Sequence, residues 1–308
     1  MRYIVDSGAR RLVPDYAVPD AICVPLWNID VHATLLSIAK VASQEIGVIL
    51  LGPDPLGASA QIAEMSDPDH VAVVAGVLNS PWIRDHAPIA VQTEVGIDLV
   101  RPRHSVEKRP DDAELFANIL PAASTTTDAW IASGNLVPGP DGLAVSTFSL
   151  LAKNEITSEE DLRNTLRADA KRLGIRDWLF VPGFPEDVSQ HTDGMVRFLG
   201  PELCAVAMHS EETSSKISDF LVEQLAECLP DAEILQIPVS DGPKGFTSPL
   251  NWIQLDDHLL VPDFEDAPGL TPEGQAMLEA RGFRITFVPS ATAGLGGALR
   301  CLTAAIFS

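Results

Sequence analysis

Short apolar segments rich in β-branched residues alternate with segments of helical period, and this alternation limits the fold more than any other feature. Strand-like segments lie at 21–26, 48–51, 71–77, 178–181, 234–239 and 283–288. Helical period is found at 31–45, 111–120, 158–173, 214–229 and 272–281. Thr157 and Glu160 form a candidate capping box at the start of the third helix. The alternation predicts a mixed α/β fold.

Two stretches of the chain have the pattern of β-hairpins. The run 136–147 contains Pro138-Gly139-Pro140-Asp141-Gly142, a strong turn sequence between apolar stretches, and the run 251–262 turns at Asp256-Asp257. Hairpins among helices argue against a purely parallel sheet, and no glycine-rich nucleotide fingerprint follows the first strand. Because no linker or low-complexity stretch interrupts this rhythm, a single domain is predicted over residues 1–308.

The charge of the chain narrows the classes of partner. It carries 43 acidic against 21 basic residues, a formal net charge of −22. Such a surface repels nucleic acid and anionic lipid, so neither is expected as a partner, and it attracts small cations. The N-terminus has no apolar signal segment, and the four cysteines lack the close spacing of a zinc or redox motif. A cytoplasmic protein without cofactor is expected, and a homodimer is the candidate oligomer.

Two polar clusters interrupt apolar sequence in the middle of the chain. Asp85 follows a predicted buried strand, where sites are commonly built. His191 and Asp193 are two residues apart, so in an extended strand both would point into one site. Zinc or iron ligation is the competing interpretation for this pair. A third ligand of convincing spacing is missing from the sequence, so no metal site is predicted.

A third cluster surrounds the last cysteine. Cys301 follows the glycine-rich stretch 294–297, which allows backbone or ligand to come close. Its neighbour Arg300 is a candidate for lowering the pKa of the thiol. A buried cysteine among apolar residues is also a common inert packing residue, and the local sequence leaves that interpretation open. A fourth cluster, 130–135, contains Gly134-Asn135, which fits a position of positive φ.

In order along the chain, these clusters resemble the family of agmatine deiminases and bacterial, Porphyromonas-type peptidylarginine deiminases, of the guanidino-group-modifying pentein superfamily. The collinear motifs are WIRDHAP at 82–88, SGN at 133–135, LLAKN at 150–154, HTDGMVRF at 191–198, SPLNWIQLDDHLLVPDF at 248–264 and GLGGALRCLT at 294–303. The first eighty residues match only loosely. The resemblance implies a pentein fold, a five-bladed α/β propeller with pseudo-fivefold strand–hairpin–helix repeats and a central site.

By the same resemblance, Cys301 is the nucleophile, His191 the general acid/base, and Asp85 and Asp193 the carboxylates that hold a guanidinium. The substrate-binding candidates are Trp82, Arg84, Asn135, Asn251 and Gly297. Two carboxylates can hold the planar cation through its N–H groups and leave its carbon open to a thiolate. The implied reaction is deimination through a covalent thiouronium intermediate, which releases ammonia and leaves a ureido product.

The chain departs from the family at several positions. Ala132-Ser133-Gly134 stands where agmatine-type members carry Glu-Gly-Gly, and Arg300 stands where His is usual. Further differences are Ala298 for Asn and Gln190 and Gly194 for Gly and Asn. Because of these changes, the sequence does not identify which guanidino compound is the substrate. They also keep two alternatives to hydrolysis in view: amidino transfer by the same residues, and a guanidine-binding protein without turnover.

Overall fold

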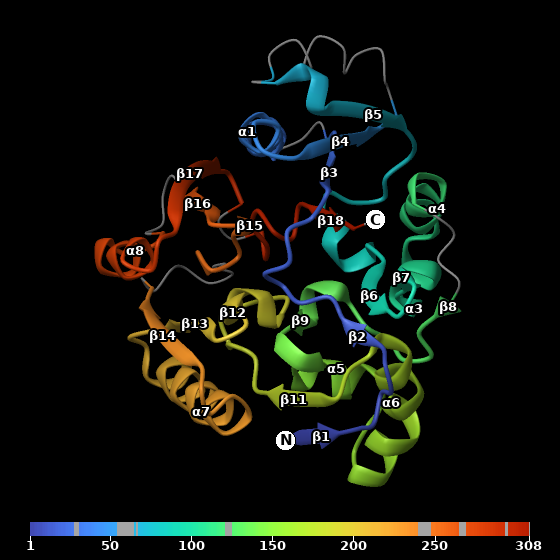
Figure 1. Cartoon of the computed structure of the whole chain (residues 1–308), viewed down its shortest axis with the longest axis vertical. Coiled ribbons are helices and arrows are strands. Elements are labelled where there is room, and N and C mark those ends of the chain that lie inside the picture. Colours follow the sequence, from blue (N-terminus) through green and yellow to red (C-terminus); the bar gives the residue numbers. More distant parts are fainter. Residues whose placement is uncertain are drawn as a thin grey trace.

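The computed structural model describes residues 1–27, 31–53, 65, 67–120, 125–239, 248–264, 269–292 and 295–307. Gly294, one of the predicted glycines, lies outside these residues. Within them the strands form five separate sheets, which Figure 1 shows placed around the middle of the molecule. The fold is α/β, as the alternation of segments predicts.

Every sheet contains the same unit: two antiparallel strands, then helix, then a strand parallel to the second. Along the chain, one unit contains β6 (Ile89–Thr93), β7 (Gly96–Arg101), α3 (Arg103–Lys108), α4 (Pro110–Ile119) and β8 (Thr125–Thr126). The next contains β9 (Val137–Pro138), β10 (Leu143–Thr147), α5 (Phe148–Lys153), α6 (Glu159–Leu173) and β11 (Asp177–Val181).

Two further units follow in the second half of the chain. One contains β12 (Val196–Gly200), β13 (Leu203–Met208), α7 (Glu212–Cys228) and β14 (Glu233–Pro238). The other contains β15 (Ile253–Leu255), β16 (His258–Phe264), α8 (Pro272–Glu279) and β17 (Arg284–Ser290). The hairpins predicted around residues 138–142 and 256–257 are β9–β10 and β15–β16, and Asp256 has φ 56° at its turn.

The two ends of the chain complete the remaining unit. The C-terminal strand β18 (Ala304–Ile306) pairs antiparallel with β3 (Ala21–Pro25), which leads through α1 (His32–Ala42) to the parallel strands β4 (Gly47–Gly52) and β5 (Val71–Ala75). Before β3, the segments β1 (Arg2–Ile4) and β2 (Arg11–Leu12) join the edges of β11 and β6. The N-terminal segment therefore connects three sheets.

The start of α6 differs slightly from the prediction. Ser158 is the N-cap, and its hydroxyl accepts a hydrogen bond from Asp161 N at 3.1 Å. The Asp161 carboxylate reaches back to accept from the Thr157 hydroxyl at 3.0 Å. The predicted box of Thr157 and Glu160 is therefore wrong by one residue. The N-cap is Ser158, and its partner three residues later is Asp161.

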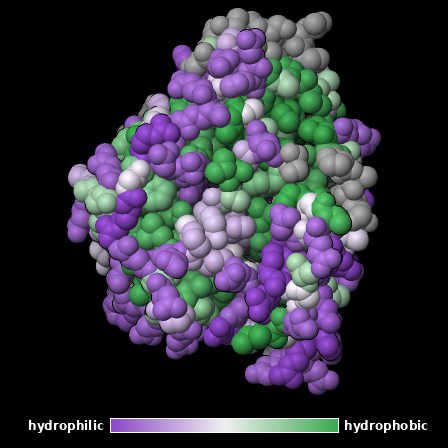
Figure 2. All heavy atoms as spheres, in the orientation of Figure 1, coloured by the Kyte–Doolittle hydropathy of each residue, from purple (hydrophilic) through white to green (hydrophobic). Residues whose placement is uncertain are grey.

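The helices bury an apolar stripe against their own sheets. Leu221 and Leu225 of α7 pack with β13 and β14, and Leu35 and Ile38 of α1 pack with β3 and β4. Hydrophilic residues cover most of the outer parts of the face in Figure 2, and apolar residues show nearer its middle. Among the described residues, no helix is long and apolar enough to cross a membrane.

A short turn precedes the first strand of every unit. Three of these turns are 3-10 helices: η2 (Ile83–His86) before β6, η3 (Ser133–Asn135) before β9 and η5 (Thr192–Gly194) before β12. The others are the segments 248–252 and 297–303, which precede β15 and β18. Because η3 contacts both η2 and η5, equivalent points of different units meet at one place. The polar clusters of the sequence lie on these turns.

Candidate active site

The proposed catalytic residues come from three of these turns. Asp85 is in η2, His191 and Asp193 are at η5, and Cys301 is in the turn before β18. His191 is the N-cap of η5, with φ −87° and ψ 151°, and Asp193 is inside the helix. The expectation of an extended strand at 191–193 is therefore wrong, because the chain turns at Thr192 before β12 begins.

Asp85 and His191 form one half of the site. His191 Nδ1 lies 3.5 Å from Asp85 Oδ1, and this oxygen also accepts a hydrogen bond from Gly134 N at 3.1 Å. A Cβ atom on Gly134 would lie 2.5 Å from Asp85 Oδ1 and 2.8 Å from His191 Nδ1. The Asp85 carboxylate and the His191 imidazole thus both pack directly against the backbone of Gly134. It has no positive φ, contrary to the expectation, and close approach is the reason for the glycine.

Gly134→Ala is expected to lower kcat/KM by about 10²-fold, since a displacement of ~1 Å in a catalytic group costs that much. The added methyl would push Asp85 and His191 apart. The fold should stay unchanged, because Gly134 has no positive φ. Steady-state kinetics with thermal unfolding as the folding check would measure it. Gly96→Ala is no suitable control, because φ is 138° there, whereas Gly200→Ala meets only the Leu203 side chain at 4.0 Å and should leave kinetics intact.

Cys301 and Asp193 form the other half of the site. Cys301 Sγ lies 3.5 Å from Asp193 Oδ2 and accepts a hydrogen bond from Asn251 Nδ2 at 3.2 Å. The same Asn251 side chain accepts hydrogen bonds from Ala298 N and Cys301 N, both at 3.2 Å. One amide therefore fixes the backbone of the cysteine turn and points a donor at the sulfur.

The thiol is held in its protonated form in the unliganded protein. Burial raises the pKa of Cys301 well above its ordinary value of 9.0, and the carboxylates of Asp193 and Asp85 raise it further. The Ala298 N–H and the Asn251 amide offset only part of this rise. The effect of Asp85 on the thiol also places both halves of the site within electrostatic range of each other.

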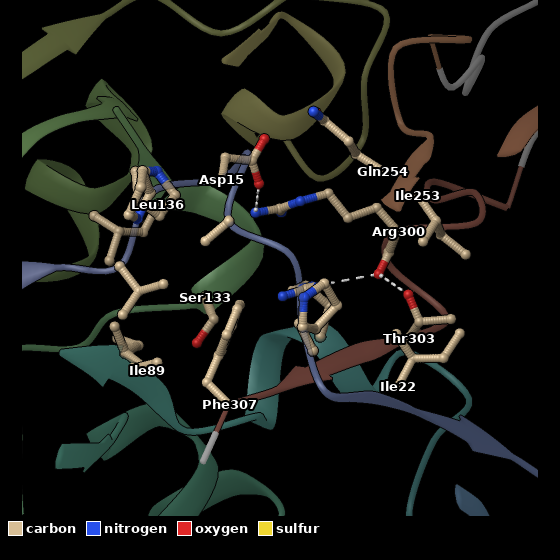
Figure 3. A pocket seen from close by; sticks show the side chains of 18 of the residues that line it. Asp15, Ile22, Ile89, Ser133, Leu136, Ile253, Gln254, Arg300, Thr303 and Phe307 are labelled. Carbon is tan, nitrogen blue, oxygen red and sulfur yellow. Dashed lines mark hydrogen bonds and ion pairs between the residues drawn. The ribbon is translucent and has the colours of Figure 1, made fainter. Parts of the chain in front are cut away.

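Arg300 interacts electrostatically with the Cys301 thiol, but its hydrogen bonds go to two carboxylates. Its guanidinium binds Asp193 Oδ2 through Nη1 at 3.0 Å and Asp15 Oδ1 through Nη2 at 3.1 Å. The other Asp15 oxygen accepts from Arg197 Nε at 2.5 Å. Figure 3 shows the contact between Asp15 and Arg300. The charge of Arg300 does not lower the pKa of Cys301 below its ordinary value, because burial and the carboxylates of Asp193 and Asp85 raise it by more.

A cavity of about 550 Å³ adjoins this site at Asp85. Trp82, Asp85 and Trp130 are among its lining residues. Its basic lining residues are His86, Lys108, Arg109 and Lys153. Lys108 Nζ lies 5.7 Å from the centre of the Trp130 ring, a cation–π distance. The lining thus combines one carboxylate with three permanent cations, on a chain whose net charge is −22.

The predicted substrate-binding residues divide into two groups. Trp82 and Gly297 lie at the site: a Cβ on Gly297 would come within 2.6 Å of Trp82 Cζ3 and 3.0 Å of Cys301 Cβ. Asn251 holds the cysteine turn. Arg84 and Asn135, like Gly297 and Asn251, do not line the 550 Å³ cavity. The side chain of Arg84 lines a different cavity, because neighbouring residues of η2 point to different sides.

Asn135 has a positioning contact instead. Its Oδ1 accepts hydrogen bonds from Thr147 N at 3.0 Å and from the Thr192 hydroxyl at 3.4 Å. With 2% of its surface exposed, it ties η3 to the turn that carries His191 and Asp193. Asn135 therefore acts on the site through the backbone.

Sequence reasoning missed Asp187 and Asp15. The carboxylate of Asp187 accepts from His191 N at 3.3 Å and from the Ser189 hydroxyl at 2.8 Å, which holds the loop before His191. Asp15 lies in the N-terminal segment, where no motif stands out. No group of three or more His, Cys, Asp or Glu side chains that could hold a metal ion occurs in the described part of the chain.

Comparisons with known proteins agree on one type of fold. A sequence profile of the family described as Porphyromonas-type peptidyl-arginine deiminase matches residues 23–306. A search of curated proteins gave no match. Among solved structures, the C. jejuni agmatine deiminase superposes with a TM-score of 0.79 at 16% identity, covering 97% of this chain and 96% of that one.

Two other solved structures extend the comparison. The agmatine deiminase of Enterococcus faecalis gives a TM-score of 0.76 at 16% identity, covering 97% of this chain and 96% of that one. A dimethylarginine dimethylaminohydrolase (DDAH) from Pseudomonas aeruginosa gives a TM-score of 0.53 at 13% identity, with 94% and 100% covered. At these identities the likeness is one of fold.

Proposed function

Because the chain belongs to the Porphyromonas-type peptidyl-arginine deiminase family, we propose that it hydrolyses the guanidino group of a small substrate, with ammonia and a ureido compound as products. The observation that carries this proposal is the grouping of the Cys301 thiol, the His191 imidazole and the carboxylates of Asp85 and Asp193. A guanidinium needs carboxylates to hold it and a nucleophile above its plane.

Substrate binding activates the nucleophile in this proposal. The pKa of Cys301 is raised by burial and by Asp193 and Asp85, so the free enzyme holds a thiol. A guanidinium bound between the two carboxylates neutralises their field, and its own positive charge favours the thiolate. The nucleophile therefore forms only when a cation of the right shape is present.

The chemical steps follow from this arrangement. The Cys301 thiol gives its proton to His191, and the thiolate attacks the guanidinium carbon. His191 then donates that proton to the nitrogen that leaves as ammonia. The resulting S-alkylthiouronium is attacked by a water that gives its proton to His191. Collapse breaks the carbon–sulfur bond and releases the ureido product, and His191 returns the proton to the sulfur to restore the thiol. The Asp85 carboxylate, whose Oδ1 lies 3.5 Å from His191 Nδ1, holds the imidazole in place for both proton transfers. A C. jejuni agmatine deiminase with a cysteine-to-serine change was solved with substrate bound, which supports a cysteine role in this fold.

The cavity lining supports a substrate whose far end is acidic. Lys108, Arg109 and Lys153 make no ion pair with a carboxylate in the described part of the chain, and all three line the 550 Å³ cavity. A distal carboxylate would be attracted by these cations, whereas the distal ammonium of agmatine would be repelled. Each such charge is worth ~1 kcal/mol at about 4 Å in water-like surroundings. A guanidino acid is therefore the proposed substrate class.

The experiment compares 4-guanidinobutyrate with agmatine, which differ mainly in the charge at the far end. We expect ammonia and a ureido acid from the first, with a kcat/KM about 10- to 100-fold above that of agmatine. Mass spectrometry of the product decides between reaction classes. A new guanidino compound formed from an added amine would indicate amidino transfer, and binding without turnover would indicate a binding protein. Either result would overturn hydrolysis.

Reversing the charge of the entrance is expected to reverse the preference. The double variant Arg109→Glu/Lys153→Glu should lose about tenfold or more in kcat/KM for 4-guanidinobutyrate and gain for agmatine, since attraction becomes repulsion. The matched control is Lys171→Glu, which changes an exposed lysine of α6 outside this cavity. An equal loss for both substrates would contradict a role in substrate choice and indicate damage to the site.

We further propose that the five sheets form a five-bladed propeller over a single domain, residues 1–308. The repeated strand–strand–helix–strand unit and the turn at the start of every unit support this arrangement. It accounts for a site whose residues come from η2, η5 and the turn before β18. Cys301, the last of them, precedes the strand that closes the sheet of β3.

A further inference from the structure

A second cavity, of about 90 Å³, lies beside the active site and shares no lining residue with the first. Figure 3 shows that side chains from several units converge on it, among them Asp15, Ser133, Gln254 and Arg300. Its volume is several times the ~15 Å³ that one water molecule requires. Nothing in the proposed reaction uses this space.

The cavity contains more positive than negative groups. Arg84, Arg197 and Arg300 line it, and Asp15 is the carboxylate among its lining residues. Both Asp15 oxygens are already engaged, one by Arg197 and one by Arg300. Arg300 also donates a hydrogen bond to Asp193 Oδ2. Among the described residues, three guanidinium groups thus face two carboxylates, and the third guanidinium is that of Arg84.

Arg84 lacks a counter-charge of its own. The hydrogen bond that its Nε donates goes to a carbonyl, Arg300 O, at 3.4 Å. Burial and the nearby Arg300 lower the pKa of Arg84 to about 9, although Asp15 and Asp193 act in the opposite direction. Its charge is therefore poorly compensated by the protein.

A buried donor without a partner lies on the same cavity. Trp252 is 0% exposed and lines the cavity, and its Nε1 has no hydrogen-bond partner among the described residues. Buried N–H groups are nearly always paired, so an unpaired one at a cavity wall indicates a ligand atom that accepts. The Arg84 guanidinium and the Trp252 indole together offer donors to an anion.

We propose that this cavity binds a small monocarboxylate, with its oxygens on Arg84 and Trp252 Nε1 and its short tail on the apolar wall. A carboxylate matches the planar fork of a guanidinium with two parallel hydrogen bonds. The apolar wall consists of Leu12, Val13, Ile22, Ile89, Leu136, Ile253 and Phe307. This wall favours acetate or propionate over a fully hydrated inorganic anion.

The test uses the tryptophans as reporters. The chain has five tryptophans, so 5-fluorotryptophan labelling gives a resolvable ¹⁹F spectrum, and Trp252→Phe assigns one resonance. Propionate is expected to shift the Trp252 resonance saturably, while propionamide, its neutral isostere, and chloride at equal concentration leave it in place. Arg84→Gln should abolish the shift, and Arg163→Gln, which changes an exposed arginine of α6, should retain it.

Three results would overturn the proposal. A propionate shift confined to Trp82 and Trp130 would place the carboxylate at the active-site entrance, which those residues line. An equal shift with chloride would mean that charge alone is recognised. Retention of the Trp252 shift in Arg84→Gln would remove Arg84 from the site. Arg84→Lys, which keeps the charge and loses the fork, should bind more weakly and covers the case in which the glutamine variant does not fold. The proposed function does not depend on this outcome, because the cavities share no residue.

Discussion

Replacing Cys301 by serine is expected to lower kcat by about 10⁴-fold or more, while a guanidino ligand still binds. The serine hydroxyl is a far weaker nucleophile than a thiolate at neutral pH. The carboxylates of Asp85 and Asp193, which we propose hold the cation, remain. Stopped-time assays of ammonia release would measure the loss, and ligand-induced stabilisation against heat would measure binding.

Cys228→Ser is the matched control for this variant. Cys228 is the last residue of α7 and is half-buried. It is not on the turn before β18 that carries Cys301. Its replacement is expected to leave kcat unchanged. Residual turnover above one hundredth of the wild-type rate in Cys301→Ser would contradict covalent catalysis by this residue.

Asp15→Asn is expected to lower the free energy of unfolding by about 3–5 kcal/mol. The side chains of Asp15, Arg197 and Arg300 are only 7%, 2% and 4% exposed, so water cannot replace the lost charge. Two buried guanidinium groups would lose a shared counter-ion. Urea denaturation of both proteins at neutral pH would measure the difference.

The effect of this substitution depends on pH with a definite sign. Burial alone would raise the pKa of Asp15, but Arg197 and Arg300 outweigh it, and the folded-state pKa is lowered. The stabilisation is therefore fully present above the unfolded pKa of about 3.9 and is lost as pH falls through the lower folded value. The difference between wild type and Asp15→Asn should be constant above about pH 5 and shrink below about pH 4.

An exposed ion pair supplies the control. Asp177 pairs with Arg2, and the two side chains are 18% and 36% exposed. Asp177→Asn is expected to cost about 1 kcal/mol or less, because water screens exposed pairs. Equal losses for the two aspartates would show that the Asp15 network contributes no more than a surface pair.

Most of the secondary structure follows from local sequence. The segments 48–51 and 178–181 form the central parts of β4 and β11. Short runs of β-branched and aromatic residues between turn residues usually form strands. The turn at Pro138–Gly142 is predictable for the same reason, because proline and glycine restrict the backbone locally.

The composition of the site was harder to predict, because its residues lie on short turns far apart in sequence. The collinear motifs identified Cys301, His191, Asp85 and Asp193, but not how they are held. Asp15 contacts Arg300 across 285 residues, and no local pattern reports such a pair. Motif position also did not report that Arg84 and Asp85, one residue apart in η2, line different cavities.

Backbone conformation explains one departure from the family. Gln190 has φ 51°, a region that glycine adopts without strain and that other residues enter at a cost. Family members commonly have glycine at this position before the histidine. The turn before His191 therefore keeps its geometry with a less suitable residue, held by the Thr147 hydroxyl, which donates to Gln190 O at 2.6 Å.

The most direct test of a guanidinium-activated thiol compares chloroacetamidine with chloroacetamide, with labelled peptides identified by mass spectrometry. The amidinium group imitates the planar substrate cation and carries its own electrophile, so the true substrate need not be known. Relative to a free thiol, the amidine should be favoured at Cys301 by about 10²-fold or more, and Asp85→Asn and Asp193→Asn should lose this preference. Slow labelling of all four cysteines by both reagents alike would contradict the proposed role of Cys301.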